Sequence, residues 1–366
     1  MKRKIKIGLF VLFIPLLFLI ISCSSTEVRQ VGQRTFELAL VSDSVREDRN
    51  AFIQGCWEGM SRYARENGIS ARLYHPNESN QNGWLEVIDL AVENGALIIV
   101  CPGFNFVVPV YIAQDKYPDV RFIMVDSVPQ SPDGRTFGAG SNSVGILYAE
   151  DQAGFLAGYA AVRDGYRRLG FMGGVAVNSV IRFGYGFIQG AEYAAVQLGL
   201  PAGNVTINYH YTGDFIESQK TQDLASSWYA NGVEVIFACG GALGKSVITA
   251  AEQLGKKVIG VDVDQSSESS SVITSAMKGL QSSIYTTIAN YYNGRFPGGQ
   301  IMVFSASSGG VALPMATSRF NSFNQKDYDA IYRMLVHGDI PRIIWLDNAG
   351  RTRIIPVTRV RVEEIL

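Results

Sequence analysis

The stretch VEVIFACGGALGKSVITAAEQLGKKVIGVDVD, residues 233–264, contains one complete unit of strand, helix and strand. Its apolar runs at 233–240 and 257–264 predict two buried strands, and the amphipathic segment at 244–255 predicts a helix between them. Strands that are apolar throughout and alternate with helices are typical of a parallel sheet covered on both faces. The stretch therefore predicts an α/β fold.

The same alternation extends over most of the chain. Before residue 233 it predicts strands at 36–43, 69–76, 96–103, 121–127, 136–143, 169–175 and 205–212, and helices at 51–68, 82–95, 107–118, 148–165, 181–199 and 217–231. After residue 264 it predicts strands at 272–279, 301–307 and 354–362, and helices at 280–293 and 325–337. The 366 residues are enough for two doubly wound domains. We expect residues 35–146 and 272–305 to form the first, and 147–271 and 306–366 the second.

Composition narrows the class of protein. The chain is 47% hydrophobic and 18% charged with a formal net charge of −1, which is typical of a packed globular protein and not of one that binds nucleic acid. The histidines His75, His210 and His337 are isolated, so we expect no metal site and no cofactor. The cysteines at 56, 101 and 239 form no C-x-x-C pair and are expected to be small buried side chains.

The N-terminal segment MKRKIKIGLFVLFIPLLFLIISC, residues 1–23, has four basic residues, an apolar run and a final cysteine, as in a signal peptide. Ile20-Ile21-Ser22-Cys23 is similar to a bacterial lipobox, which predicts cleavage after residue 22, palmitate on Cys23 and a lipidated tether over 23–34. An uncleaved anchor helix is the alternative. In both cases we expect the protein to be held at the cell membrane, on its periplasmic or extracellular side.

The segment FACGGALGKS, residues 237–246, is one residue away from a nucleotide-binding P-loop. Gly244-Lys245-Ser246 match the end of that motif, but Cys239 stands where its first glycine is required. ATP would also be scarce outside the cytoplasm. Gly240 and Gly241 are therefore expected to form another kind of ligand loop at the end of a strand.

Polar residues or glycines end several predicted strands, where ligands of open parallel sheets bind. Taken in order, several segments resemble the basic membrane protein family of bacterial substrate-binding lipoproteins, whose best-understood type is the purine nucleoside receptor. These segments are AFIQGCWEGM, YPDVRFIMVDS, EDQAGFLAGYAA, GFMGGVAVNSVIRFGYGFIQGAE, YTGDF, VIFACGGALGKSVITAAEQLG, IGVDVDQ and VITSAMKG.

The resemblance implies a type I periplasmic-binding-protein fold, in which two Rossmann-like lobes are joined by a hinge of three crossovers. It implies a monomeric binding protein, not an enzyme, that delivers guanosine, inosine or adenosine to an ABC permease. A binding protein for a sugar or a signalling molecule and a surface adhesin are the alternatives left open.

The resemblance also implies roles for single residues. Phe52 and Phe183 would stack on the two faces of the base. Asp43, Ser44 and Asp126 would read the edge of the base. Asp262 and Lys278 would hold the ribose hydroxyls beside the backbone of Gly240 and Gly241. Each has a plain structural alternative: a core ring, a helix cap or an exposed lysine.

The loop SVREDRNAFIQ, residues 44–54, departs from the family pattern. Ser44 and Ile53 stand where the family has asparagine, and Arg46 and Arg49 enter the loop. The arginines are expected either to be solvated or to pair with the neighbouring Glu47 and Asp48. A change in the preferred ligand would come from this loop.

Overall fold

The computed structural model describes residues 36–364 except 46–49, 341–342, 347–350 and 355, and these residues belong to one compact unit. The predicted lipidation site at Cys23 and the loop arginines Arg46 and Arg49 lie outside the described residues. No helix within the described part of the chain is long and apolar enough to cross a membrane.

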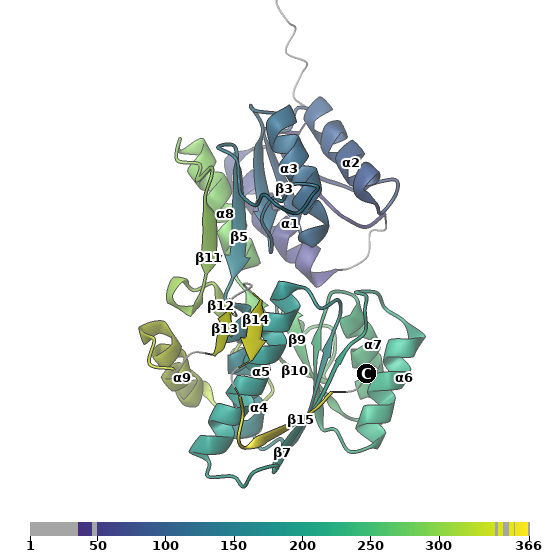
Figure 1. The fold of residues 1–366 in the computed structure, drawn as a ribbon, viewed down its shortest axis with the longest axis vertical. Coiled ribbons are helices and arrows are strands. Elements are labelled where there is room, and N and C mark those ends of the chain that lie inside the picture. The colour runs from purple at the N-terminus through teal and green to yellow at the C-terminus, as the bar shows by residue number, and fades with distance from the viewer. Residues whose placement is uncertain (1–35, 46–49, 341–342, 347–350, 355, 365–366) are drawn as a thin grey trace, which may run out of the picture. The chain divides into compact units, whose positions relative to one another are not determined.

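The first sheet is entirely parallel, with the strand order β11-β5-β4-β3-β1-β2. Its strands are β1 (Leu38–Val41), β2 (Ala71–Tyr74), β3 (Ile98–Pro102), β4 (Arg121–Val125), β5 (Ser143–Tyr148) and β11 (Ile301–Phe304). Helices α1 (Ala51–Asn67) and α8 (Leu280–Tyr292) pack against each other and bury their apolar side chains on one face. Helices α2 (Gln81–Glu93) and α3 (Val107–Lys116) cover the other (Figure 1).

The second sheet has the order β12-β10-β9-β8-β6-β7-β15 and is parallel except for β12. Its strands are β6 (Arg168–Gly173), β7 (Val205–Tyr211), β8 (Val235–Cys239), β9 (Lys257–Asp262), β10 (Val272–Lys278), β12 (Val311–Ala312) and β15 (Val360–Glu364). Helices α4 (Glu150–Arg163) and α5 (Asn178–Gln197) cover one face, and α6 (Gln219–Ala230) and α7 (Leu243–Leu254) the other. Helix α9 (Gln325–His337) packs on α4, and the hairpin of β13 (Ile344–Leu346) and β14 (Thr352–Ile354) packs on α5. The two sheets confirm the predicted doubly wound α/β architecture.

The chain passes between the two sheets three times. It crosses at Ala149 after β5, at Gly279 after β10, and over 305–310 between β11 and β12. Backbone hydrogen bonds tie the crossings together: the Ala149 amide donates to Phe304 at 2.9 Å, and the Gly279 amide donates to Gly310 at 2.9 Å. The crossings therefore form one hinge, as the resemblance implied.

Four sequence-based boundaries were wrong. The first lobe was expected to end at residue 146, but β5 continues in the first sheet to Tyr148. Residues 272–278 were expected in the first domain, but β10 pairs with β9 because its apolar run completes the second sheet, and the chain re-enters the first sheet only after Gly279. The strand expected at 136–143 is a loop with one isolated bridge, and the continuous apolar run at 143–148 forms β5 instead. The last strand starts at Val360, beyond Pro356, whose ring removes a backbone donor.

Helices α4 and α5 approach each other through four glycines. Two of them lie four residues apart on each helix: Gly154 and Gly158 on α4, and Gly186 and Gly190 on α5. A Cβ atom on any of the four would lie 1.9 to 2.1 Å from a backbone oxygen of the other helix. Only hydrogen atoms fit in this contact, so the glycines fix how closely the two helices pack.

Candidate functional site

A cavity of about 800 Å³ lies at the carboxyl ends of strands from both sheets. Its lining includes all nine residues that the sequence predicted: Asp43, Ser44, Phe52, Asp126, Phe183, Gly240, Gly241, Asp262 and Lys278. The structure thus brings together side chains from positions up to 235 residues apart in the chain. Their contact with a ligand stays a prediction.

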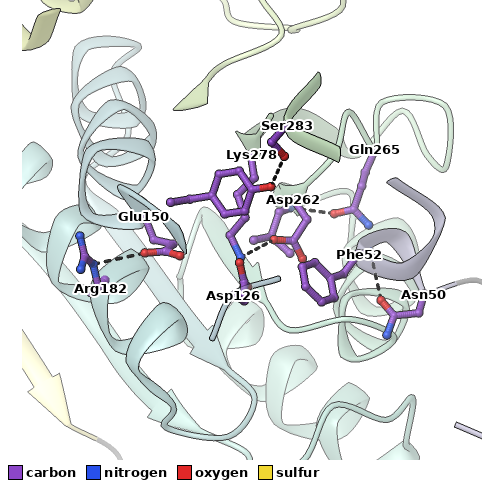
Figure 2. A network of polar contacts seen from close by, with 11 residues as sticks. Asn50, Phe52, Asp126, Glu150, Arg182, Asp262, Gln265, Lys278 and Ser283 are labelled. Carbon is purple, nitrogen blue, oxygen red and sulfur yellow. Dashed lines mark hydrogen bonds and ion pairs between the residues drawn. The ribbon is translucent and has the colours of Figure 1, made fainter. Parts of the chain in front are cut away.

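Lys278 forms the centre of the site. It is the last residue of β10, and its ammonium pairs with Asp126, which follows β4 of the first sheet. The same ammonium lies 3.2 Å from Oδ1 of Asp262, the last residue of β9 (Figure 2). One cation therefore joins carboxylates from both sheets.

Three aromatic rings surround this ammonium. Its Nζ lies 5.2 Å from the ring centroid of Phe52, 5.1 Å from that of Phe183 and 5.8 Å from that of Tyr148. A cation within about 6 Å of a ring is attracted by the negative face of the ring. The rings predicted to stack on a base and the lysine predicted to hold a ribose thus form one cluster. Tyr148, whose hydroxyl lies 2.5 Å from Ser283 Oγ, was missed from the sequence.

The charges in this cluster depend on one another because they are buried. The Lys278 side chain is only 3% exposed. Burial alone would lower the pKa of Lys278, but Asp126 and Asp262 hold that pKa well above its usual value. Burial raises the pKa of Asp126, and the Lys278 ammonium limits that rise.

Both carboxylates at this cavity keep one acceptor oxygen without a hydrogen bond from the described residues. Oδ1 of Asp126 and Oδ1 of Asp262 are buried and accept no hydrogen bond within the described part of the chain. The Asp262 oxygen is near Lys278, but the contact lacks hydrogen-bond geometry and is an ion pair only. A buried acceptor without a donor is costly, so hydroxyl or N–H donors of a ligand would be favoured here.

The two aspartates share a rare backbone conformation. Asp126 has φ 64° and Asp262 has φ 67°, and no other non-glycine residue among those described has a positive φ. Such a residue costs about 1–3 kcal/mol, although aspartate tolerates the left-handed region better than most. Strain of this kind gathers at functional sites, and both aspartates line the cavity. Nothing in the sequence indicated this conformation.

A second charged cluster borders the cavity. Arg182 of α5 lies 3.2 Å from Glu150 and 2.9 Å from Asp151, both in the first turn of α4. Burial raises the pKa of Glu150 to about 7, although the Lys278 and Arg182 cations oppose this shift. Sequence reasoning missed this pair because acidic residues are common in the first turn of any helix.

The glycines at the ends of β6 and β8 have an unexpected neighbour. A Cβ atom on Gly174 would lie 2.3 Å from the ring of Phe215, and a Cβ atom on Gly240 would lie 3.0 Å from it. These glycines therefore make room for an aromatic side chain that also lines the cavity. The neighbouring Ser246 is buried, and its hydroxyl accepts from the Ser218 amide at 2.9 Å, which is a structural role and not that of a phosphate loop.

The loop that follows β1 is fixed by hydrogen bonds from two other segments of the first sheet's lobe. Asn105 donates to Oδ2 of Asp43 at 2.9 Å, and the Trp84 indole donates to the Asp43 carbonyl at 2.9 Å. Asn50 caps α1 by accepting from the Phe52 amide at 3.0 Å, which sets the start of the helix that carries Phe52. Thr352 of β14 also lines the cavity, and no sequence signal pointed to it.

Comparisons with known proteins agree with this architecture. The family described as ABC transporter substrate-binding protein PnrA-like matches residues 36–341. The chain is 25% identical over 296 residues to the ABC transporter nucleoside-binding protein BmpA of Lactococcus lactis, covering 75% of this chain and 80% of that protein. It is 25% identical over 340 residues to basic membrane protein A1 of Borrelia garinii, covering 92% and 95% of the two chains.

A solved structure of ABC transporter solute-binding proteins from Aeropyrum pernix K1 superposes with a TM-score of 0.70 at 20% identity, covering 85% of this chain and 92% of that one. At this identity the likeness concerns the fold alone. It agrees with the type I periplasmic-binding-protein fold that the two sheets and the hinge of three crossovers indicate.

Proposed function

The chain belongs to the family of PnrA-like ABC transporter substrate-binding proteins, and from this premise we propose that it captures a purine nucleoside in the cavity and delivers it to an ABC permease. It acts as a monomer at the membrane, outside the cytoplasm. The observation that carries the nucleoside assignment is the cluster at Lys278, where aromatic rings lie beside two carboxylates with unused acceptor oxygens. The name of the Lactococcus lactis relative supports the same ligand class.

The two parts of a nucleoside suit the two kinds of group in this cluster. A purine offers two flat faces, and stacking on an aromatic side chain contributes about 1–3 kcal/mol per base. Phe52 and Phe183 both line the cavity. Phe183 is only 1% exposed and packs edge-on against Phe237, so Phe52 offers the more accessible ring. A ribose offers two adjacent hydroxyl donors, and a carboxylate accepts such a pair well. Asp262, beside Gly240 and Gly241, supplies that acceptor.

We predict that Asp262→Ala weakens the binding of guanosine or inosine by about tenfold to a hundredfold, because a hydrogen bond to a charged group contributes roughly 1.5–3 kcal/mol. The loss should be much smaller for the free bases, which lack the ribose. Calorimetry with ribonucleosides, their 2′-deoxy analogues and free bases measures the difference.

Asp264→Ala is the matched control. Asp264 lies two residues further on, accepts from Thr317 and is not part of the cavity lining, so nucleoside affinity should not change. Equal weakening of bases and nucleosides by Asp262→Ala would contradict the ribose assignment. If the wild type binds no nucleoside but binds a sugar, the nucleoside proposal is wrong and the loop at 44–54 is the first place to look.

We also propose that Cys23 carries the lipid that holds the protein at the membrane. Cys23→Ala is expected to leave an unprocessed precursor without fatty acid, because the thiol that accepts the lipid is gone. Labelling with radioactive palmitate measures this, and Cys101→Ala should label as the wild type does because Cys101 is buried in β3. Normal labelling of Cys23→Ala would rule the proposal out.

A further inference from the structure

Two further aromatic residues line the cavity, outside the cluster at Lys278. Phe104 begins the short 3-10 helix that follows β3 of the first sheet, and Phe215 follows β7 of the second. Their ring centroids are 6.3 Å apart, with an angle of 54° between the ring planes. The two side chains therefore meet across the cleft between the sheets.

The Phe215 side of this contact is held firmly. Its ring lies against Gly174 and Gly240, and its carbonyl accepts from the Leu243 amide at 3.2 Å. A second approach between the same regions lies nearby, where a Cβ atom on Gly241 would be 3.4 Å from Nδ2 of Asn50. Phe104 is different, since it is 36% exposed and its ring is the more accessible partner.

Counted in strands from the hinge, the contact lies beyond the strands that carry the three crossings. The three crossings run from β5 to α4, from β10 to α8 and from β11 to β12. Strands β11 and β5 are the first two at one edge of the first sheet, and β12 and β10 are the first two at the matching edge of the second. Counted from those edges, β3 is the fourth strand and β7 is the sixth. When lobes rotate about a hinge, groups far from it separate most.

We propose that Phe104 and Phe215 are positioning residues that form a closing contact across the cleft and thereby retain the bound ligand. A contact made in only one of two conformations shifts the equilibrium toward that conformation by its own free energy. An aromatic pair is strong enough to change an equilibrium constant by about 2- to 10-fold. Because the ligand leaves from the open form, the effect should appear in the dissociation rate.

The kinetic test uses Phe104→Ala, because Phe104 is partly exposed and its loss should not unfold the protein. The dissociation rate of guanosine should rise by about 2- to 10-fold, while the association rate changes by less than about twofold. Phe215→Ala should raise the dissociation rate similarly, and the double variant should dissociate no faster than either single one. Phe137→Ala is the control, since Phe137 is 61% exposed and lies outside the cavity lining.

A second readout measures closure itself, with spin labels on cysteines introduced at Glu86 of α2 and Ser227 of α6, both exposed positions. Double electron–electron resonance measures the distance between the two labels. Fewer molecules should have the short distance of the closed form in Phe104→Ala than in the wild type. The use of guanosine in the kinetic test rests on the proposed function. The distance measurement is made without ligand and does not depend on that proposal. Absence of guanosine binding would therefore overturn the nucleoside proposal alone.

Two results would overturn the closing contact. In the first, Phe104→Ala has the same dissociation rate and the same distance distribution as the wild type. In the second, the effects of the two single variants on the dissociation rate add up in the double variant, or Phe137→Ala changes this rate as much as Phe104→Ala does. A faster dissociation of guanosine with an unchanged distance distribution would show a direct ligand contact, and would also refute the closing role.

Discussion

Lys278→Met is expected to lower the free energy of unfolding by about 3–5 kcal/mol at neutral pH and to abolish ligand binding. The ammonium is buried and pairs with Asp126 and Asp262, so its removal leaves two neighbouring carboxylates in a low-dielectric site without a cation. Methionine keeps most of the volume, which separates the loss of charge from the loss of packing. Chemical denaturation and calorimetry with guanosine measure the two effects.

The matched control is Lys116→Met, which breaks an ion pair with Asp89 of similar length, 2.8 Å. Lys116 is 51% exposed, so water replaces the lost partner and stability should hardly change. Adding Asp126→Asn to Lys278→Met should restore part of the lost stability, because it removes one of the stranded charges. If Lys278→Met is as stable as Lys116→Met, the buried cluster does not have the energetic role described here.

The pH dependence of this variant follows from the same charges. Without the ammonium, only burial and Asp262 act on Asp126, and both raise its pKa. A carboxyl whose folded pKa is raised stabilises the fold at low pH, and this contribution is lost as the pH rises through that value. The difference in stability between Lys278→Met and the wild type should therefore shrink as the pH falls from about 7 toward 5.

Gly186→Ala combined with Gly190→Ala is expected to destabilise the protein by about 3 kcal/mol or more. Each added methyl would meet a backbone oxygen of α4 at 1.9 to 2.1 Å, and a backbone cannot move aside as a side chain can. The helices must separate, which would also displace Glu150 and Arg182 at their ends. Guanosine affinity should fall together with the free energy of unfolding.

Gly244→Ala is the control for helix glycines in general. Gly244 lies in α7, and the nearest atom to an added Cβ would be 3.9 Å away. Its replacement should be neutral or stabilise by up to about 1 kcal/mol, because alanine has the higher helix propensity. Similar stability of Gly244→Ala and the α5 double variant would show that the close packing of α4 and α5 carries no special energy.

The fold was predictable because its strands are continuous apolar runs, as in 233–240 and 257–264, and such runs leave few other arrangements. Boundaries failed where this signal weakens. The loop at 136–143 contains small residues that suit a strand or a turn equally, and 272–278 is apolar enough for either sheet. In such places the pairing with strands distant in the sequence decides which residues form a strand and which sheet they join. A local sequence pattern carries no information on that pairing.

Strand ends indicated part of the candidate site, whereas Phe52 and Phe183, which lie in helices α1 and α5, were predicted only through the family resemblance. Asp126 and Asp262 could be proposed from their positions, but their left-handed backbone could not, since neighbouring residues give no sign of it. Glu150 was hidden because an acidic residue at a helix start usually has a local role. Phe215 was missed because glycines at the ends of strands suggested that a ligand approaches the backbone there. In the structure Gly174 and Gly240 also make room for the ring of Phe215.

The two strand orders have one more consequence. From the hinge edge inward, β5, β4, β3, β1 and β2 occupy the same successive places in the first sheet as β10, β9, β8, β6 and β7 in the second. The lobes are thus topological copies, and Asp126 and Asp262 end equivalent strands with nearly equal φ. The strand ends at the site therefore have a twofold symmetry of topology, whereas a nucleoside has two unlike halves. That symmetry is broken where β10 ends in Lys278 and β5 ends in Tyr148, so we expect this pair to decide which way round an asymmetric ligand binds.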